Sequence, residues 1–421
     1  MPRLDKCEAC GVGETSRKKL LLCSGCRVGI YCSVACQESA RKSHTRICQI
    51  ISKLPPKDAD AVVIHHEQIT DFNAGIRYAT KYMDNLKHVE INTRFDVGMR
   101  SEYEEGWANI KLTAKKLSSL VRSKKDTLDS FFWFSEDYDH DHFHKITSYG
   151  QALMCLHGLK QLRLEYPSYR TAQDLYNFIY QQKETMEVLS LSDLALDNER
   201  WEWSRDSCKT IAFAVSFCTK LVKLELECSA LHDSDLEIIL HNLPNIRCLH
   251  LENHTEADWP GFTDKSCYLI SKKCPNLQVL NLNQHFRITY VGIHTIIQGC
   301  PHLRIFRSST HGMSLGNWKF LLPIAPQLLV LSLGSSVETT DEEITEIVEQ
   351  AGGRLLIQYE GDYDEVEDIE DLSPKAKKEY GLRKTLFTRM NIRKDDPKIS
   401  NEWDELFGTN TSGRISLKIV S

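Results

Sequence analysis

A pattern of apolar positions, L-x-x-L-x-L, recurs along the middle of the chain. The central apolar residues of successive copies lie 27, 35, 25, 31, 26 and 25 residues apart. Because side chains alternate along a strand, each copy predicts a short strand whose first, fourth and sixth positions face a core. The copies are LKQLRL (159–164), MEVLSL (186–191), LVKLEL (221–226), IRCLHL (246–251), LQVLNL (277–282), LRIFRS (303–308) and LLVLSL (328–333).

The stretches between these copies have the character of helices. Examples are SDLEIILHNL (234–243), KSCYLISKKC (265–274) and YVGIHTIIQGC (290–300). One strand and one helix in each repeat predict an α/β solenoid with a curved parallel sheet. Weaker copies of the strand pattern are LKHVEI (86–91), LDSFFW (128–133) and RLLIQY (354–359).

The repeats resemble leucine-rich repeats, most strongly over residues 215–335. C-P-N-L (274–277) and C-P-H-L (300–303) resemble the cysteine-containing subtype. Lone cysteines at repeat positions are typical of buried apolar thiols. We expect this role for Cys155, Cys208, Cys218, Cys267, Cys274 and Cys300.

The alternation also predicts which side chains turn away from the core. Positions three, five and seven of each copy should line a wide, mixed concave face that suits a protein partner. A merely solvated sheet face is the alternative. The predicted positions are Gln161, Arg163, Glu165, Lys223, Glu225, Glu227, Cys248, His250, Glu252, Val279, Asn281, Asn283, Ile305 and Arg307.

A different pattern, of metal-binding residue types, occupies residues 7–48. Its spacing is C-x2-C-x12-C-x2-C-x5-C-x3-C-x7-H-x3-C. Each short gap lets two side chains converge on one ion, so four pairs supply two closed tetrahedral sites for structural zinc. A disulfide framework is the alternative, but seven cysteines are an odd number and would leave the histidine unused. The candidate ligands are Cys7, Cys10, Cys23, Cys26, Cys32, Cys36, His44 and Cys48.

The segment CSGCRVGIYCSVACQESARKSHTRIC (23–48) resembles a MYND zinc finger, and the resemblance extends to Cys7 and Cys10. It implies a protein-interaction module that takes short proline-containing peptides. Gln37 matches a residue of the family's peptide groove, whereas Arg41 stands where family members often carry Trp. The resemblance also implies interleaved sites, with one Zn²⁺ held by Cys7, Cys10, Cys32 and Cys36 and the other by Cys23, Cys26, His44 and Cys48.

Composition and charge mainly exclude kinds of partner and cellular location. The net charge of −6 gives no general attraction to nucleic acid or to an anionic membrane. No apolar run reaches the roughly 20 residues of a membrane span, and the N-terminus lacks the apolar stretch of a secretory signal. These features predict a nuclear or cytoplasmic protein with reduced thiols.

Other segments carry weaker signals. SEDYDHDHFHK (135–145) sets His140, His142 and His144 among aspartates, so it is either a metal site or a polar loop. EGDYDEVEDIED (360–371) is expected to be a solvated acidic segment that closes the solenoid. LPPK (54–57) marks the exit from the finger. We therefore predict a finger over 1–55, a solenoid over 56–360, and an acidic segment with a C-terminal cap or tail over 361–421.

Three functions are compatible with this organisation. The preferred one is a non-enzymatic zinc-binding adaptor whose finger and concave face each bind a protein partner. A substrate receptor of a ubiquitin ligase complex is the second, because similar repeats are commonly joined to an F-box, although no L-P-x-E-L segment occurs. A MYND-containing lysine methyltransferase is the third, but Asn253-His254 is followed by Thr-Glu rather than by the expected cysteine. No hydrolase triad signature or phosphate-binding loop stands out.

Overall fold

The computed structural model describes most of the repeat region and short parts of the N-terminal segment. It divides into two compact units, residues 1–248 and 249–421. The described residues are 21–22, 30–31, 33–39, 59–66, 69–93, 116–135, 153–165, 172–192, 205–227, 231–252, 261–308, 315–334 and 356–360.

The first unit contains a parallel sheet whose strands follow one another in chain order. The residues at the centre of the sequence pattern stand side by side, in the register Val89↔Phe131↔Leu162↔Leu189↔Leu224. This register confirms the predicted strands, including the two weak early copies. The first strand, β3, was not predicted. The strands are β3 (Ala61–His66), β4 (His88–Thr93), β5 (Ser130–Ser135), β6 (Gln161–Glu165), β7 (Val188–Ser192) and β8 (Lys223–Glu227).

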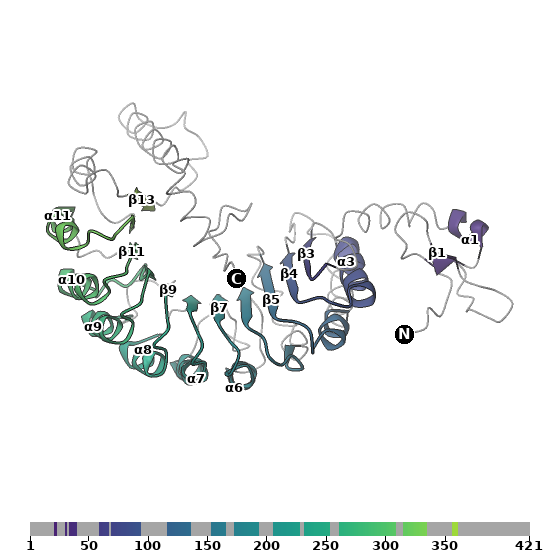
Figure 1. Cartoon of the computed structure of the whole chain (residues 1–421), viewed down its shortest axis with the longest axis horizontal. Coiled ribbons are helices and arrows are strands. Elements are labelled where there is room, and N and C mark those ends of the chain that lie inside the picture. Colours follow the sequence, from purple (N-terminus) through teal and green to yellow (C-terminus); the bar gives the residue numbers. More distant parts are fainter. Residues whose placement is uncertain are drawn as a thin grey trace, which may run out of the picture. The chain divides into compact units, whose positions relative to one another are not determined.

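Helices of the first unit lie along one side of these strands (Figure 1). They are α3 (Ile69–Tyr82), α6 (Ala172–Gln181), α7 (Arg205–Ser216) and α8 (Asp233–Leu240). Helix α7 packs between α6 and α8. Leu189 and Leu224 of the sheet and Leu175 and Ile211 of the helices are buried in the core. Burial of this apolar surface is the main force that holds each repeat on its neighbour.

The second unit repeats the same plan. Its strands are also parallel, with Leu280↔Phe306↔Leu331↔Ile357 in register. The strands are β10 (Val279–Asn281), β11 (Ile305–Ser308), β12 (Val330–Gly334) and β13 (Leu356–Glu360), and β9 (Cys248–Glu252) spans the division between the units. The helices are α9 (Asp264–Lys273), α10 (Tyr290–Gly299), α11 (Leu315–Leu321) and the 3₁₀ turn η2 (Leu322–Ile324).

A repeated hydrogen-bond pattern fixes each strand to the next. The carbonyl just before one strand accepts two backbone N–H groups from the start of the following repeat. Lys160 O, for example, accepts from Glu187 N at 2.7 Å and from Val188 N at 3.0 Å. The same arrangement occurs at Asp60, Lys87, Asp129, Glu187, Val222, Gln278 and Arg304. Repeats of unequal length therefore start their strands in the same register.

The cysteines of the repeats are mostly buried, as the sequence predicted. Cys208, Cys218, Cys267, Cys274 and Cys300 have no exposed surface. Cys155 is an exception, because it lies in a turn and is only half-buried. The prediction of a fully buried thiol at Cys155 is therefore wrong.

None of the helices in the described part of the chain combines the length and the apolar character that a membrane crossing requires.

Candidate metal and protein-interaction sites

The N-terminal segment contains a short hairpin and one helical turn. Strand β1 (Leu21–Leu22) pairs antiparallel with β2 (Ile30–Tyr31), and Leu22 stands opposite Ile30. Helix α1 (Val34–Ser39) follows directly. In the sequence, the Cys23/Cys26 pair falls between the two strands, and Cys32 falls between β2 and α1.

Cys36 is the one predicted ligand that lies among the described residues. It is half-buried on α1, and its backbone N–H donates to Ser33 Oγ at 3.2 Å. This bond is typical of a helix N-terminus, where a serine side chain satisfies an N–H that has no helical partner. The helix begins at Val34, one residue after the serine that caps it.

The remaining ligand positions lie outside the described residues, so their geometry stays a prediction. They are Cys7, Cys10, Cys23, Cys26, Cys32, His44 and Cys48. Arg41 and the histidine segment around His140, His142 and His144 also lie outside the described residues, as does the acidic segment beyond Glu360.

The chemistry of the predicted donor set fits zinc. Seven thiols and one imidazole are the soft and borderline donors that Zn²⁺ prefers, and they divide into two sets of four. Across the part of the chain that the structure describes, no three His, Cys, Asp or Glu side chains come together as a metal site.

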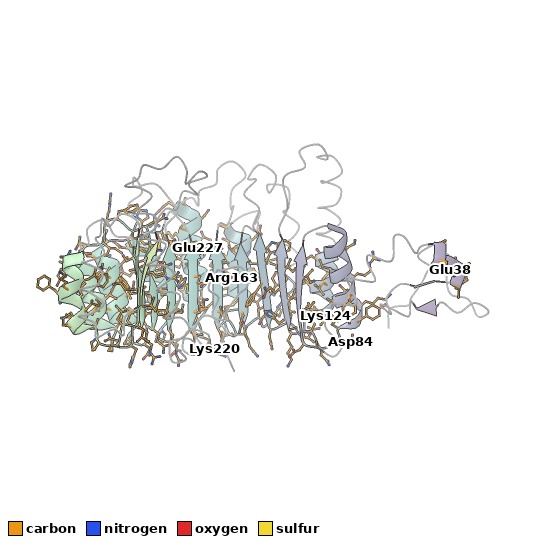
Figure 2. The ribbon with its side chains drawn as sticks, turned by 90° about the horizontal axis from the view of Figure 1, so that it is seen from above. Glu38, Asp84, Lys124, Arg163, Lys220 and Glu227 are labelled. Atoms are coloured by element: carbon orange, nitrogen blue, oxygen red, sulfur yellow. The ribbon has the colours of Figure 1, made fainter. Side chains whose placement is uncertain are left out.

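The sheet face opposite the helices carries rows of side chains from the predicted concave positions. In the first unit, position five forms the row Glu90↔Phe132↔Arg163↔Ser190↔Glu225. Arg163 lies near the middle of its strand and Glu227 near the end of β8, while Lys220 lies at the opposite edge (Figure 2). The row is mixed in charge, as the sequence predicted.

The same face is less accessible than expected. Lys223 is 5% exposed and Glu225 is 6% exposed, and Lys223 Nζ lies 2.7 Å from Glu225 Oε1. Position three of the second unit forms an aliphatic row, Val279↔Ile305↔Val330, whose members are all buried. Seven of the predicted concave positions are therefore buried and not accessible to a partner: Lys223, Glu225, Cys248, Val279, Asn281, Asn283 and Ile305.

The physical reason lies in the spacing of the strands. Adjacent parallel strands are about 4.8 Å apart, so side chains at equivalent positions pack against one another and shield one another from solvent. Sequence alternation gives the face of a side chain but not this lateral packing. Gln161, Arg163, Glu227, His250, Glu252 and Arg307 are half-buried and remain candidates for contact with a partner.

Two polar arrangements were not predicted from the sequence. His285 is 2% exposed, and its Nδ1 accepts from Phe262 N at 3.2 Å while its Nε2 lies 2.7 Å from Leu251 O. These partners assign the neutral Nε2–H tautomer, which bridges one repeat to the next. The sequence contained one indication of this role for His285. Counting Leu277 as the first residue, His285 is the ninth, and L-x-x-L-x-L repeats carry a polar residue at that position.

The second unpredicted arrangement joins α7 to α8. Asp235 is fully buried, pairs with the Arg205 guanidinium, and accepts the backbone N–H of His232 at 2.9 Å. Arg205 also donates to Ser234 Oγ at 2.9 Å. The pair fixes the start of α8 against the start of α7, so its role is structural.

Comparison with known proteins adds one assignment. The family model of the MYND finger matches residues 7–48, from the first predicted ligand to the last. No curated protein matches the chain. Among solved structures, a chain of the Rad7 and Elc1 complex in yeast has 12% sequence identity and a TM-score of 0.43, with 76% of this chain and 80% of that chain covered. That likeness is too slight to support an argument.

Proposed function

We propose that the chain is a zinc-binding adaptor whose MYND-type segment and repeat body bind different protein partners. The observation that carries the proposal is the match of residues 7–48 to the MYND finger, which is a protein-interaction module. The finger is joined to a series of parallel strand–helix repeats, an architecture that offers extended surfaces to partners. We propose no catalytic activity for the chain, and a place in the nucleus or the cytoplasm.

The zinc sites would organise the finger rather than react. Two Zn²⁺ ions would be held by the sets Cys7, Cys10, Cys32, Cys36 and Cys23, Cys26, His44, Cys48. This crossed division is the one that the MYND resemblance of residues 7–48 implies. A segment of this size has too little core to fold without the metal.

The peptide preference of the finger would depart from the usual one. Family fingers take proline-containing peptides, and a Trp helps to line their groove. Arg41 replaces that ring with a cation. An acidic residue next to the proline would therefore suit this chain better than an apolar one.

The repeat body would use the half-buried polar residues of its sheet face. Arg163 and Glu227 are half-buried and so remain accessible to a partner, whereas Lys223 and Glu225 are buried. We propose that this face, in leucine-rich-repeat fashion, recognises a folded partner through its mixed charge.

The proposal is tested by affinity purification from cells with the full-length chain and single variants. Cys36→Ser should remove the finger partners and keep the body partners, and Arg163→Glu should do the reverse. Cys155→Ser and Arg122→Glu are matched controls, since Cys155 is not a predicted ligand and Arg122 is exposed away from the sheet face. Identical partner sets for Cys36→Ser and the unchanged chain would overturn the adaptor proposal.

A further inference from the structure

The helices of the second unit expose large apolar side chains. Tyr268 of α9 is 55% exposed, Val291 of α10 64%, Phe320 of α11 73% and Ile324 of η2 42%. We call these four residues the helix-face patch. Isolated exposed apolar residues are common on proteins, but several on consecutive helices are typical of an interaction surface.

The residues of the helix-face patch lie on helices that pack against each other. A Cβ atom at Gly299 would lie 2.4 Å from Ser271 Cβ, and one at Gly292 would lie 2.9 Å from Cys267 Sγ. Helices α9 and α10 thus meet along these small residues. Tyr268 follows Cys267 in the sequence and Val291 precedes Gly292, and both side chains are exposed. Helix α10 also contacts α11.

The charge around the helix-face patch has one sign. Helix α9 carries Lys265, Lys272 and Lys273, α11 carries Lys319, and α10 carries no charged residue. The one carboxylate in these helices, Asp264, accepts from Thr289 N at 2.8 Å and from Thr289 Oγ1 at 2.6 Å.

The helices of the first unit contrast with this arrangement. Helix α8 carries Asp233, Asp235 and Glu237 and no base, and α7 carries both signs. A basic rim around exposed apolar side chains is therefore a property of α9 to α11 rather than of the repeats in general.

We propose that the helix-face patch binds an acidic peptide segment with apolar side chains at short intervals. The apolar side chains would pack on Val291, Phe320 and Tyr268, and the carboxylates would pair with the lysines of α9 and α11. Helix α10, with its exposed Val291, packs between α9 and α11, which carry the lysines, and this arrangement fits an extended chain better than a uniformly anionic membrane. Lys272 Nζ is 5.6 Å from the Tyr268 ring centroid, so it lies close enough to receive a carboxylate beside a packed aromatic. This surface shares no residue with the finger segment or with the sheet-face positions.

The test is fluorescence anisotropy with the full-length chain and a labelled synthetic peptide. The probe is a short peptide of Asp and Glu with Leu at every third position. One control peptide has Asn and Gln in place of the acids, and the other has Ser in place of Leu. Binding of the acidic peptide should weaken about tenfold with Lys272→Glu/Lys273→Glu and with Phe320→Ser, and it should weaken as salt rises.

Matched variants on α7 keep the test specific. Phe213 is 43% exposed and Lys209 is exposed on α7, so Phe213→Ser and Lys209→Glu should leave the affinity unchanged. Thermal unfolding of each variant shows that the chain is folded. The proposal is overturned by equal binding of the neutral peptide, by unchanged affinity in the α9 and α11 variants, or by binding to phosphatidylserine vesicles without binding to the peptide.

Discussion

Burial changes the chemistry of individual residues in the repeats. Burial raises the pKa of Cys218, Cys274 and Cys300 to about 12, and at Cys274 the neighbouring Cys300 adds to the effect. Burial also lowers the pKa of Lys124, although Asp84 at 3.9 Å opposes that change. Figure 2 shows Lys124 and Asp84 together at one edge of the sheet. These side chains serve packing and are not reactive groups.

The buried thiols should resist alkylation. Only the thiolate reacts with iodoacetamide, and a thiol of pKa near 12 holds about one part in ten thousand as thiolate at pH 8. Peptide mass spectrometry after brief labelling of the native chain should leave Cys218, Cys274 and Cys300 unmodified, with the half-buried Cys155 labelled before them. Rapid labelling of Cys274 in the native chain would contradict the account of its burial.

The same pKa shifts set a dependence of stability on pH. The folded state keeps a proton that the unfolded state releases above its ordinary pKa of 9.0, up to about 12. Below pH 9 these thiols add no pH dependence, and between pH 9 and 12 they make the free energy of unfolding fall. Urea denaturation at a series of pH values should show this alkaline decline, and it should be smaller in Cys218→Ala. An equally steep decline in that variant would rule out the thiol as its source.

The Lys223–Glu225 pair should matter to stability more than to partner binding. Glu225→Gln leaves a buried ammonium group without its counter-charge, which should lower the free energy of unfolding by about 3–5 kcal/mol. Replacing both residues, as Lys223→Met with Glu225→Leu, should recover most of the loss. Lys220→Met, at an exposed edge position, is the control and should change little. A Glu225→Gln chain as stable as the unchanged one would show that the pair is not a buried ion pair in solution.

The strands and helices were largely predictable from sequence, because the apolar positions that predict each strand lie within a few consecutive residues. Leu162, Leu189 and Leu224 were picked from spacing alone, and they stand in one row of the sheet. Strand β3 was missed because Ala61–His66, AVVIHH, contains no leucine and does not match the repeat spacing. Contacts between repeats could not be predicted from the sequence. An example is the ion pair of Asp235 with Arg205, which lies thirty residues earlier. Sequence patterns describe one element at a time, whereas these contacts depend on how two elements meet.

Close packing of α9 on α10 requires glycine at one position. Gly299→Ala would place a Cβ 2.9 Å from the Cα and the carbonyl oxygen of Ser271, which are backbone atoms and cannot swing away. Pushing the helices apart should lower the free energy of unfolding by about 1–3 kcal/mol. This loss should exceed the stabilisation that alanine's higher helix propensity provides. Urea denaturation measures the loss, and Thr295→Ala on the same helix is the control. A more stable Gly299→Ala chain would mean that the helices are not held this closely.

For the whole molecule, the sequence predicted the α/β repeats and the MYND-type segment but not the accessibility of the sheet face. The finger spacing was specific, because eight ligands in four pairs are seldom arranged so by chance, and the family match covers the same residues. Its internal geometry and the three-part division of the chain remain predictions. The folding of a metal-organised segment depends on an ion that the sequence only implies. Such a segment has few apolar positions in a regular pattern, so its internal structure cannot be predicted from hydrophobic periodicity.

One measurement tests most directly whether the finger is a metal-organised module on a separately folded body. Zinc released from the full-length chain by a chelator is measured with a colorimetric dye while far-ultraviolet circular dichroism is recorded on the same sample. The account predicts release of two zinc ions per chain, given eight ligands in two sets of four, with the helical signal of the repeats retained. Release of fewer than two ions, or loss of the helical signal together with the metal, would contradict it.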